Sequence, residues 1–113
     1  MAIDVNAELK YYQYSPQKMR LVIDLVRGKN AEQSVSMLRF VNKKAAKPVS
    51  KLISSALANA ENNFGLAREK MFIYKIHADA APIRKWRRFG ARGRFKPILR
   101  RSSHVQIVLR EKE

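Results

Sequence analysis

The residues best suited to chemistry in this chain are cationic, and they gather in one stretch. Residues 80–110 contain no Asp or Glu but ten Lys or Arg, and eight of the ten are Arg. The stretch supplies +10 of the formal net charge of +15. Because guanidinium groups bind phosphates in pairs of hydrogen bonds and stack on bases, it predicts nucleic-acid binding. Apart from Arg110, the basic residues of this stretch are Arg84, Lys85, Arg87, Arg88, Arg92, Arg94, Lys96, Arg100 and Arg101.

Aromatic residues and glycines within this stretch favour an antiparallel hairpin that contacts RNA. Trp86, Phe89 and Phe95 lie among the arginines, and aromatic faces stack on unpaired bases. Gly90 and Gly93 lie near the midpoint, where a tight reversal needs positive φ. The flanks alternate apolar and polar residues, as half-buried strands do. The apolar positions expected to share the buried face are Phe72, Tyr74, Ile76, Val105, Ile107 and Leu109.

Acid–base or metal chemistry has little support in the sequence. A strand would place His77 and Asp79 on one face, and His104 lies at the other root of the predicted hairpin. Two protein ligands are too few for a catalytic metal site, so strand-end polar residues or RNA contacts explain these side chains better. The chain shows no Gly-rich phosphate loop and no nucleophile motif. We therefore expect a non-enzymatic protein without a metal or cofactor.

The remaining residues must form the scaffold that holds the hairpin. Residues 3–11 alternate and predict a strand with one buried face. That face is expected to carry Ile3, Val5, Ala7, Leu9 and Tyr11. The cluster of Tyr11, Tyr12 and Tyr14 is explained equally well by base stacking and by packing at the strand end.

A first helix is predicted to begin after Ser15, a suitable N-cap, and to end at Gly28. Pro16 suits its first helical position. Lys18 and Arg20 lie near the helix start, where cations are unfavourable unless a bound phosphate offsets them. A basic helix face that is simply exposed to solvent explains Lys18 and Arg20 equally well. The buried stripe is expected to hold Met19, Val22, Ile23 and Val26, widened by Leu21 and Leu25.

Two further helices complete the expected scaffold. The shorter covers residues 31–40, with Val35 and Leu38 facing inward. The longer begins near Asn42 as its N-cap, passes an irregularity at Pro48 and ends near Gly65. Its apolar residues at helical spacing make it the spine of the core. They are Val49, Leu52, Ile53, Ala56, Leu57 and Ala60.

These elements predict an α+β fold in a single domain. Three helices should pack on one face of a three-stranded antiparallel sheet, with two strands prolonged into a long protruding basic β-hairpin. The globular body comprises residues 1–79 and 104–113, and the arm comprises residues 80–103. Arm strands of about ten residues would span roughly 30 Å.

Composition narrows the class of protein further. The chain contains no Cys, which excludes disulfides and thiolate metal sites. It has no apolar run of the ~18–20 residues that a membrane span needs. Residues 1–5 do not resemble a signal peptide, so we expect the chain to stay in the compartment where it is made.

Six short segments add a family resemblance that runs over nearly the whole chain. They are residues 15–22 (SPQKMRLV), 24–29 (DLVRGK), 42–46 (NKKAA), 55–60 (SALANA), 91–94 (ARGR) and 101–104 (RSSH). In this order and spacing they resemble the large-subunit ribosomal protein 22 family of the bacterial type. The resemblance implies a structural constituent of the large ribosomal subunit that binds several rRNA domains and supports early subunit assembly. It also implies that the β-hairpin lines the nascent-polypeptide exit tunnel.

The resemblance also implies partners, a location and contact residues. Partners are large-subunit rRNA, neighbouring large-subunit ribosomal proteins and the nascent polypeptide, with no membrane span and no homo-oligomer. The location is the ribosome, with the bacterial cytoplasm favoured over an organelle. The implied rRNA contacts of the body are Lys18, Arg20, Arg27, Lys29, Lys43 and Lys44, and those of the arm root are Arg101, Ser103 and His104. The implied tip and tunnel residues are Trp86, Arg88, Phe89, Gly90, Ala91, Arg92 and Gly93, followed by Arg94.

The sequence departs from the family pattern in two places. Members often carry Asp-Glu-Gly-Pro before the arm, whereas this chain has Asp79-Ala80-Ala81-Pro82, which leaves the arm more purely cationic. A proline–arginine pair is common at the tip, where this chain has Phe89-Gly90. The shape of the tip turn and its contacts with nascent chains or tunnel-binding antibiotics therefore do not follow from the resemblance.

Two other functions suit parts of the sequence. An architectural DNA-binding protein with basic β-arms would prefer duplex DNA and usually form a dimer. A small nuclease using His77, Asp79 and His104 would cleave strands and lose activity in His77→Ala.

Overall fold

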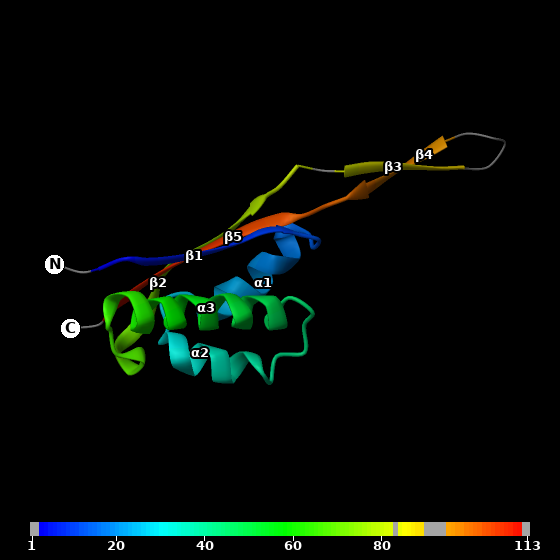
Figure 1. Ribbon diagram of the computed structural model, residues 1–113. Helices are drawn as coiled ribbons and strands as arrows, with labels where there is room; N and C mark the ends of the chain where they lie inside the picture. Colours follow the sequence, from blue (N-terminus) through cyan, green and yellow to red (C-terminus); the bar gives the residue numbers. More distant parts are fainter. Residues whose placement is uncertain (1–2, 83, 90–94, 112–113) are drawn as a thin grey trace.

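A computed structural model describes residues 3–82, 84–89 and 95–111, with only the backbone described for 84–89 and 95–100. In the described part, three helices cover one face of a three-stranded antiparallel sheet, which confirms the predicted α+β class (Figure 1). The strands are β1 (Val5–Tyr12), β2 (Met71–Ala80) and β5 (Ser103–Glu111), with β5 in the centre. The helices are α1 (Pro16–Val26), α2 (Ala31–Leu38) and α3 (Ala46–Phe64), and the 3₁₀ turn η1 (Arg68–Lys70) leads into β2.

A separate two-stranded ribbon projects from the end of this sheet (Figure 1). Strands β3 (Arg84–Phe89) and β4 (Phe95–Arg100) pair antiparallel, with Arg84 opposite Arg100. The long sheet strands do not run into the ribbon without interruption, because the strand pairing breaks at residues 81–82 and 101–102. At this break the Ala81 N–H donates to the Ser102 carbonyl oxygen at 3.0 Å and keeps the two chain segments together. The longest dimension of the molecule is 64 Å, against 26 and 19 Å for the others.

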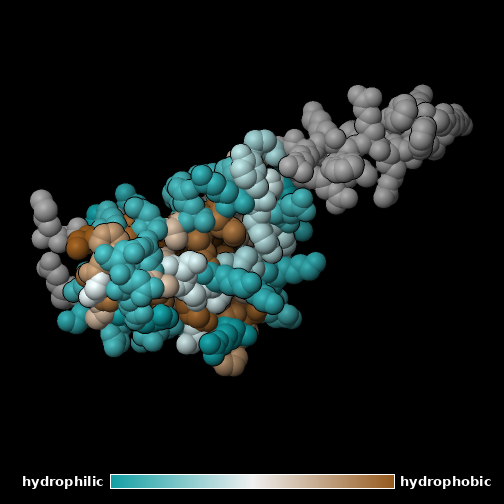
Figure 2. Space-filling model, in the orientation of Figure 1, coloured by the Kyte–Doolittle hydropathy of each residue, from teal (hydrophilic) through white to brown (hydrophobic). Residues whose placement is uncertain are grey.

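The hydrophobic core lies between the sheet and the helices. All six apolar residues of the predicted α3 stripe are buried, and so are Val105, Ile107 and Leu109 on β5. The α1 stripe of Met19, Val22, Ile23 and Val26 completes the contact with the sheet. Figure 2 shows mostly hydrophilic residues over the visible face of the body, with hydrophobic residues in the gaps between them.

Most predicted helix ends agree with the structure, including that of α3 at Gly65, whereas α2 ends two residues earlier than predicted and the start of α3 differs. The Ser15 hydroxyl oxygen accepts a hydrogen bond from the Lys18 N–H at 3.4 Å, which confirms the predicted cap of α1. Gly28 follows this helix with φ +78°, a conformation that suits glycine. The prediction for Asn42 is wrong, because α3 begins at Ala46 and its N-cap, Ala45, makes no side-chain cap bond. Pro48 is thus the third residue of α3, where a helix needs no N–H donor.

Two β-bulges explain the wrong predictions of burial for Tyr11 and Tyr74. The register of β1 shifts between Leu9 and Tyr12, so Tyr11 is 62% exposed instead of buried. The register of β2 shifts between Ile73 and Lys75, which leaves Tyr74 exposed while Met71 and Ile73 are buried. A shift of one residue moves every later side chain to the opposite face.

Other apolar residues expected in the core also lie outside it. Phe72 is only partly buried, on the face of β2 opposite Met71 and Ile73. Ile3 precedes β1 and is 41% exposed. Leu21 and Leu25 do not widen the buried stripe of α1, because they are 60% and 42% exposed.

Candidate nucleic-acid interface

Basic side chains surround an open hollow where α1 meets the arm root. The hollow has a volume of about 630 Å³ and is lined by Ser15, Pro16, Gln17, Lys18, Arg20, Ala80 and Arg101. It opens at the N-terminal turn of α1, which contains no acidic residue. The helix dipole and three cations therefore act together to attract an anion. The structure thus brings together Lys18, Arg20 and Arg101, three of the residues predicted from the sequence.

A second group of cations lies at the start of α3. Lys43 and Lys44 precede the helix, and its first turn likewise contains no acidic residue. Lys47 and Lys51 join them in lining two adjacent hollows of about 350 and 380 Å³, and Arg39 lines the second. The sequence analysis missed Lys47, Lys51 and Arg39. The spacing of Lys47 and Lys51 places them on one face of α3 and was the available signal.

Two of the predicted RNA contacts also hold the fold together. The Arg20 guanidinium donates to the Ala78 carbonyl oxygen from Nε at 3.2 Å and from Nη2 at 3.0 Å. The Arg27 Nη2 donates to the Ile76 carbonyl oxygen at 3.0 Å, and its Nη1 pairs with Asp24 at 2.5 Å. Both carbonyls belong to β2, an edge strand of the sheet. Arg20 and Arg27 therefore satisfy backbone acceptors that an uncovered edge would expose.

Lys29 extends this cover of the β2 edge through its backbone. Its carbonyl oxygen accepts from the Ile73 N–H at 2.9 Å, while the Gly28 N–H donates to the Ile73 carbonyl oxygen at 3.1 Å. The Lys29 residue is exposed overall. Its ammonium group is therefore available to an anion while its carbonyl oxygen bonds to the β2 edge.

Residues at the arm root have different roles from one another. Ser103 is fully buried, and its hydroxyl donates to the Tyr14 carbonyl oxygen at 2.5 Å. This side chain therefore positions the segment before α1 and does not reach the surface. His104 is partly exposed, and its Nδ1 accepts from the Tyr11 N–H at 3.1 Å.

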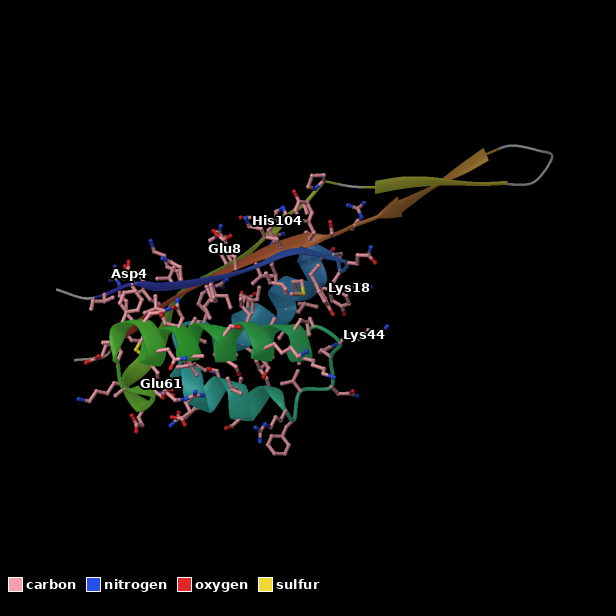
Figure 3. The ribbon with its side chains drawn as sticks, viewed as in Figure 1. Asp4, Glu8, Lys18, Lys44, Glu61 and His104 are labelled. Carbon is pink, nitrogen blue, oxygen red and sulfur yellow. The ribbon has the colours of Figure 1, made fainter. Side chains whose placement is uncertain are left out.

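The face of the sheet away from the helices is nearly balanced in charge. Figure 3 shows Asp4, Glu8 and His104 on this side of the sheet. Asp4 pairs with Arg110, whose guanidinium carbon lies 3.5 Å from the centre of the Tyr74 ring. The hydrogen bond from Arg110 lowers the pKa of Asp4 below its ordinary value of 3.8. Because its charges are already paired, this face attracts a polyanion less than the start of α3 does.

Two groups of cations lie at the end of the body nearer the arm. Figure 3 places Lys18 and Lys44 at the end nearer the arm, whereas Glu61 and Asp4 both lie toward the opposite end. At that end Glu61 pairs with Arg68 at 3.7 Å, so the negative charge of Glu61 offsets the positive charge of Arg68. The positive end of the body adjoins the arm root, where Arg101 lines the same hollow as Lys18 and Arg20.

The structure gives the nuclease hypothesis little support. His77 Nε2 lies 3.4 Å from Asp79 Oδ2, and Asp79 is directly opposite His104 in the sheet register. His104 Nδ1 nevertheless bonds to the backbone of Tyr11. Within residues 3–82 and 101–111, no group of three or more His, Cys, Asp or Glu side chains is placed to hold a metal ion.

The backbone of the arm places its predicted residues along both strands of the ribbon. Arg84, Lys85, Trp86, Arg87, Arg88 and Phe89 form β3, and Phe95, Lys96 and Arg100 belong to β4. The predicted tip residues Gly90, Ala91, Arg92, Gly93 and Arg94 lie outside the described residues. No helix in the described part of the chain is long and apolar enough to cross a membrane.

Comparisons with known proteins agree with this arrangement. The sequence profile of the ribosomal protein L22p/L17e family matches residues 7–110. The large ribosomal subunit protein uL22 of Dehalococcoides mccartyi (strain ATCC BAA-2266 / KCTC 15142 / 195) is 48% identical over 107 residues, 95% of this chain and 98% of that protein. The uL22 protein of Finegoldia magna is 41% identical over 111 residues, 98% of this chain and 99% of that protein. The chain therefore belongs to the ribosomal protein L22p/L17e family.

Proposed function

We propose that this protein is a constituent of the large ribosomal subunit that binds its rRNA through the positive end of the body and the basic arm together. The observation that carries the proposal is the hollow at the arm root, which Lys18 and Arg20 of the body line together with Arg101. As a member of a ribosomal protein family, the chain is a structural protein and not an enzyme. The bacterial relatives named as large-subunit proteins support this placement and a bacterial cytoplasmic ribosome, with an organellar ribosome as the alternative.

Phosphate neutralisation is the proposed mechanism of binding by the body. Lys18 and Arg101 bind phosphates at the hollow beside α1, and Lys43, Lys44 and Lys47 bind them at the start of α3. Release of counterions from the RNA drives this association. Arg20, Arg27 and Lys29 contribute their remaining donors, and Ser103 acts by positioning the arm root.

The arm has a separate role in this proposal. Its arginines contact several rRNA domains and support early assembly, while Trp86 and the tip around Phe89 line the nascent-polypeptide exit tunnel. The elongated shape supports this division, because a ribbon that projects from the body reaches RNA that the body cannot. Neighbouring large-subunit proteins and the nascent chain are the proposed protein partners.

Sedimentation of a cell extract tests the proposal. The protein is traced through a sucrose gradient before and after a moderately high-salt wash, which screens surface charges. We expect it to remain with the large subunit after the wash, because an embedded arm does not dissociate when surface contacts weaken. Migration near the top of the gradient, or with nucleoid DNA, would contradict the proposal and favour the architectural DNA-binding function.

A further inference from the structure

Tyr11 has a backbone conformation that a tyrosine rarely adopts. Its φ is +55°, in the left-handed region that favours glycine, and it lies within the bulge of β1. A strained conformation persists only where other contacts hold it, and such strain is common at binding sites. The residue is not buried for packing, because Tyr11 is 62% exposed. The fold therefore holds an aromatic ring at the surface at a conformational cost.

His104 is the residue that holds this ring in place. Its Nδ1 accepts the Tyr11 N–H at 3.1 Å, and the two rings meet edge to face with centroids 4.5 Å apart and an interplanar angle of 87°. Because Nδ1 is the acceptor, the imidazole proton is on Nε2, which can donate. The pair combines an exposed aromatic ring with a hydrogen-bond donor beside it.

The surroundings of this pair suit a nucleobase better than a phosphate. A hollow of about 350 Å³ is lined by Glu8, Leu9, Lys10, Tyr11, Asp79, His104, Val105 and Gln106. Two carboxylates in this lining, those of Glu8 and Asp79, would repel a phosphate. Carboxylates accept hydrogen bonds from the exocyclic amino groups of bases. Glu8 already accepts from Gln106 Nε2 at 3.0 Å and pairs with the Lys10 ammonium at 3.5 Å. Asp79 pairs with His77 through Oδ2 at 3.4 Å, so Asp79 Oδ1 is the acceptor offered to a base.

We propose that Tyr11 and His104 form a site for one unstacked, amino-bearing nucleobase of the bound RNA. The base stacks on the Tyr11 ring, and its amino group donates to the Asp79 carboxylate directly across the sheet from His104. This inference rests on the proposed function, because it assigns one base contact within an rRNA complex. It adds a site on the charge-balanced face of the sheet, where the distribution of cations alone would predict no RNA.

The substitution Tyr11→Asn separates function from packing. Asn tolerates positive φ and keeps the backbone N–H that bonds to His104, but it removes the ring. We expect the melting temperature of the variant to equal or exceed that of the wild type, since strain is relieved. We expect its affinity for purified large-subunit rRNA to fall roughly 5-fold to 100-fold, the range for loss of one stacked base. The salt dependence of binding should not change, because no charge is lost.

Two further variants complete the binding experiment. Tyr11→Phe keeps the aromatic face and should bind as the wild type does. Phe64→Leu removes an exposed aromatic residue at the end of α3 distant from the arm and should leave affinity unchanged (Figure 1). If the wild type itself does not bind rRNA, the proposed function fails. If the wild type and Tyr11→Asn bind equally, only this inference is overturned.

A photoreactive phenylalanine analogue introduced at position 11 identifies what covers the ring. The full chain carrying the analogue is assembled into large subunits and irradiated. A cross-link to one unpaired A, C or G of the rRNA is the expected result. A cross-link to a ribosomal protein would overturn the inference, and so would reaction of the analogue with solvent alone, without any cross-link.

Discussion

The guanidinium of Arg20 on α1 donates two hydrogen bonds to the backbone carbonyl of Ala78 on β2, at 3.2 and 3.0 Å. This contact joins the helix whose first turn lines the hollow at the arm root to the edge strand that leads into the arm. One side chain therefore sets the distance between two parts of the proposed RNA-binding surface. The charge of Arg20 is proposed to attract RNA, whereas its two hydrogen bonds hold α1 against β2. Different substitutions can remove one of these contributions without the other.

Replacing Arg20 by Met should lower the stability of the protein in the absence of RNA. Loss of both bonds leaves the Ala78 carbonyl less well satisfied and should cost about 1 kcal/mol of unfolding free energy. That change corresponds to a fall of about 4 °C in melting temperature, measured by circular dichroism. Arg20→Lys should also be destabilised, since an ammonium group cannot reproduce the planar fork. Lys18→Met is the matched control, and an Arg20→Lys variant as stable as the wild type would show that charge alone suffices.

Removing the lysines ahead of α3 should weaken RNA binding in a salt-dependent manner. In Lys43→Gln/Lys44→Gln, each lost phosphate contact should reduce the slope of log K against log salt by about 0.7–0.9. The measurement is a titration of purified large-subunit rRNA at several salt concentrations. Lys70→Gln/Lys75→Gln removes equal charge away from the start of α3. An equal change of slope in both double variants would mean that binding depends on net charge and not on position.

Acidification should remove the contribution of the Asp4–Arg110 pair to stability. The hydrogen bond from Arg110 lowers the pKa of Asp4 in the folded state, so the pair stabilises the fold above the unfolded-state pKa. This contribution is lost as the pH falls below about 4 and through the depressed folded-state value. Asp4→Asn should therefore be less stable than the wild type at neutral pH, and the two melting temperatures should converge in acid. A difference that persists at the lowest pH would exclude the ion pair as its cause.

Deleting the arm should leave the body folded. The core residues belong to the three helices and to β1, β2 and β5, and the Ala81–Ser102 hydrogen bond closes the root. A variant in which a two-residue Asn-Gly turn replaces residues 83–100 should keep a cooperative thermal transition close to that of the full chain. It should still bind rRNA, with lower affinity. Failure to fold, or complete loss of binding, would contradict the proposed division between body and arm.

The sequence predicted the class of the fold because its strongest patterns are local. The α3 stripe from Val49 to Ala60 and the alternation from Val105 to Leu109 each identify a buried face without reference to other elements. Ser15 and Gly28 mark helix ends through their own side-chain and backbone chemistry. Such signals need no knowledge of which elements are neighbours in space.

The wrong predictions depend on neighbours that the sequence does not identify. Alternation alone assigns Tyr11 and Tyr74 to the core, because a bulge leaves no clear mark in a run of apolar residues. Asn42 resembles a cap, but the start of α3 depends on a turn in which the Ala46 N–H donates to Lys43. The structural roles of Arg20 and Arg27 follow from β2 being an edge strand, which is a property of the assembled sheet.

The central position of β5 has a mechanical consequence. The two chain segments that enter the arm come from β2 and β5, which are paired side by side over most of their length. Tension along the arm would pull both strands lengthwise in the same direction, so their mutual bonds would not be sheared. The load would pass to the bonds between β5 and β1, which would bear it together and would not open one after another. β1 and the Arg20 and Arg27 contacts support this pair from either side. The body is therefore built as an anchor that resists extraction of the arm by force.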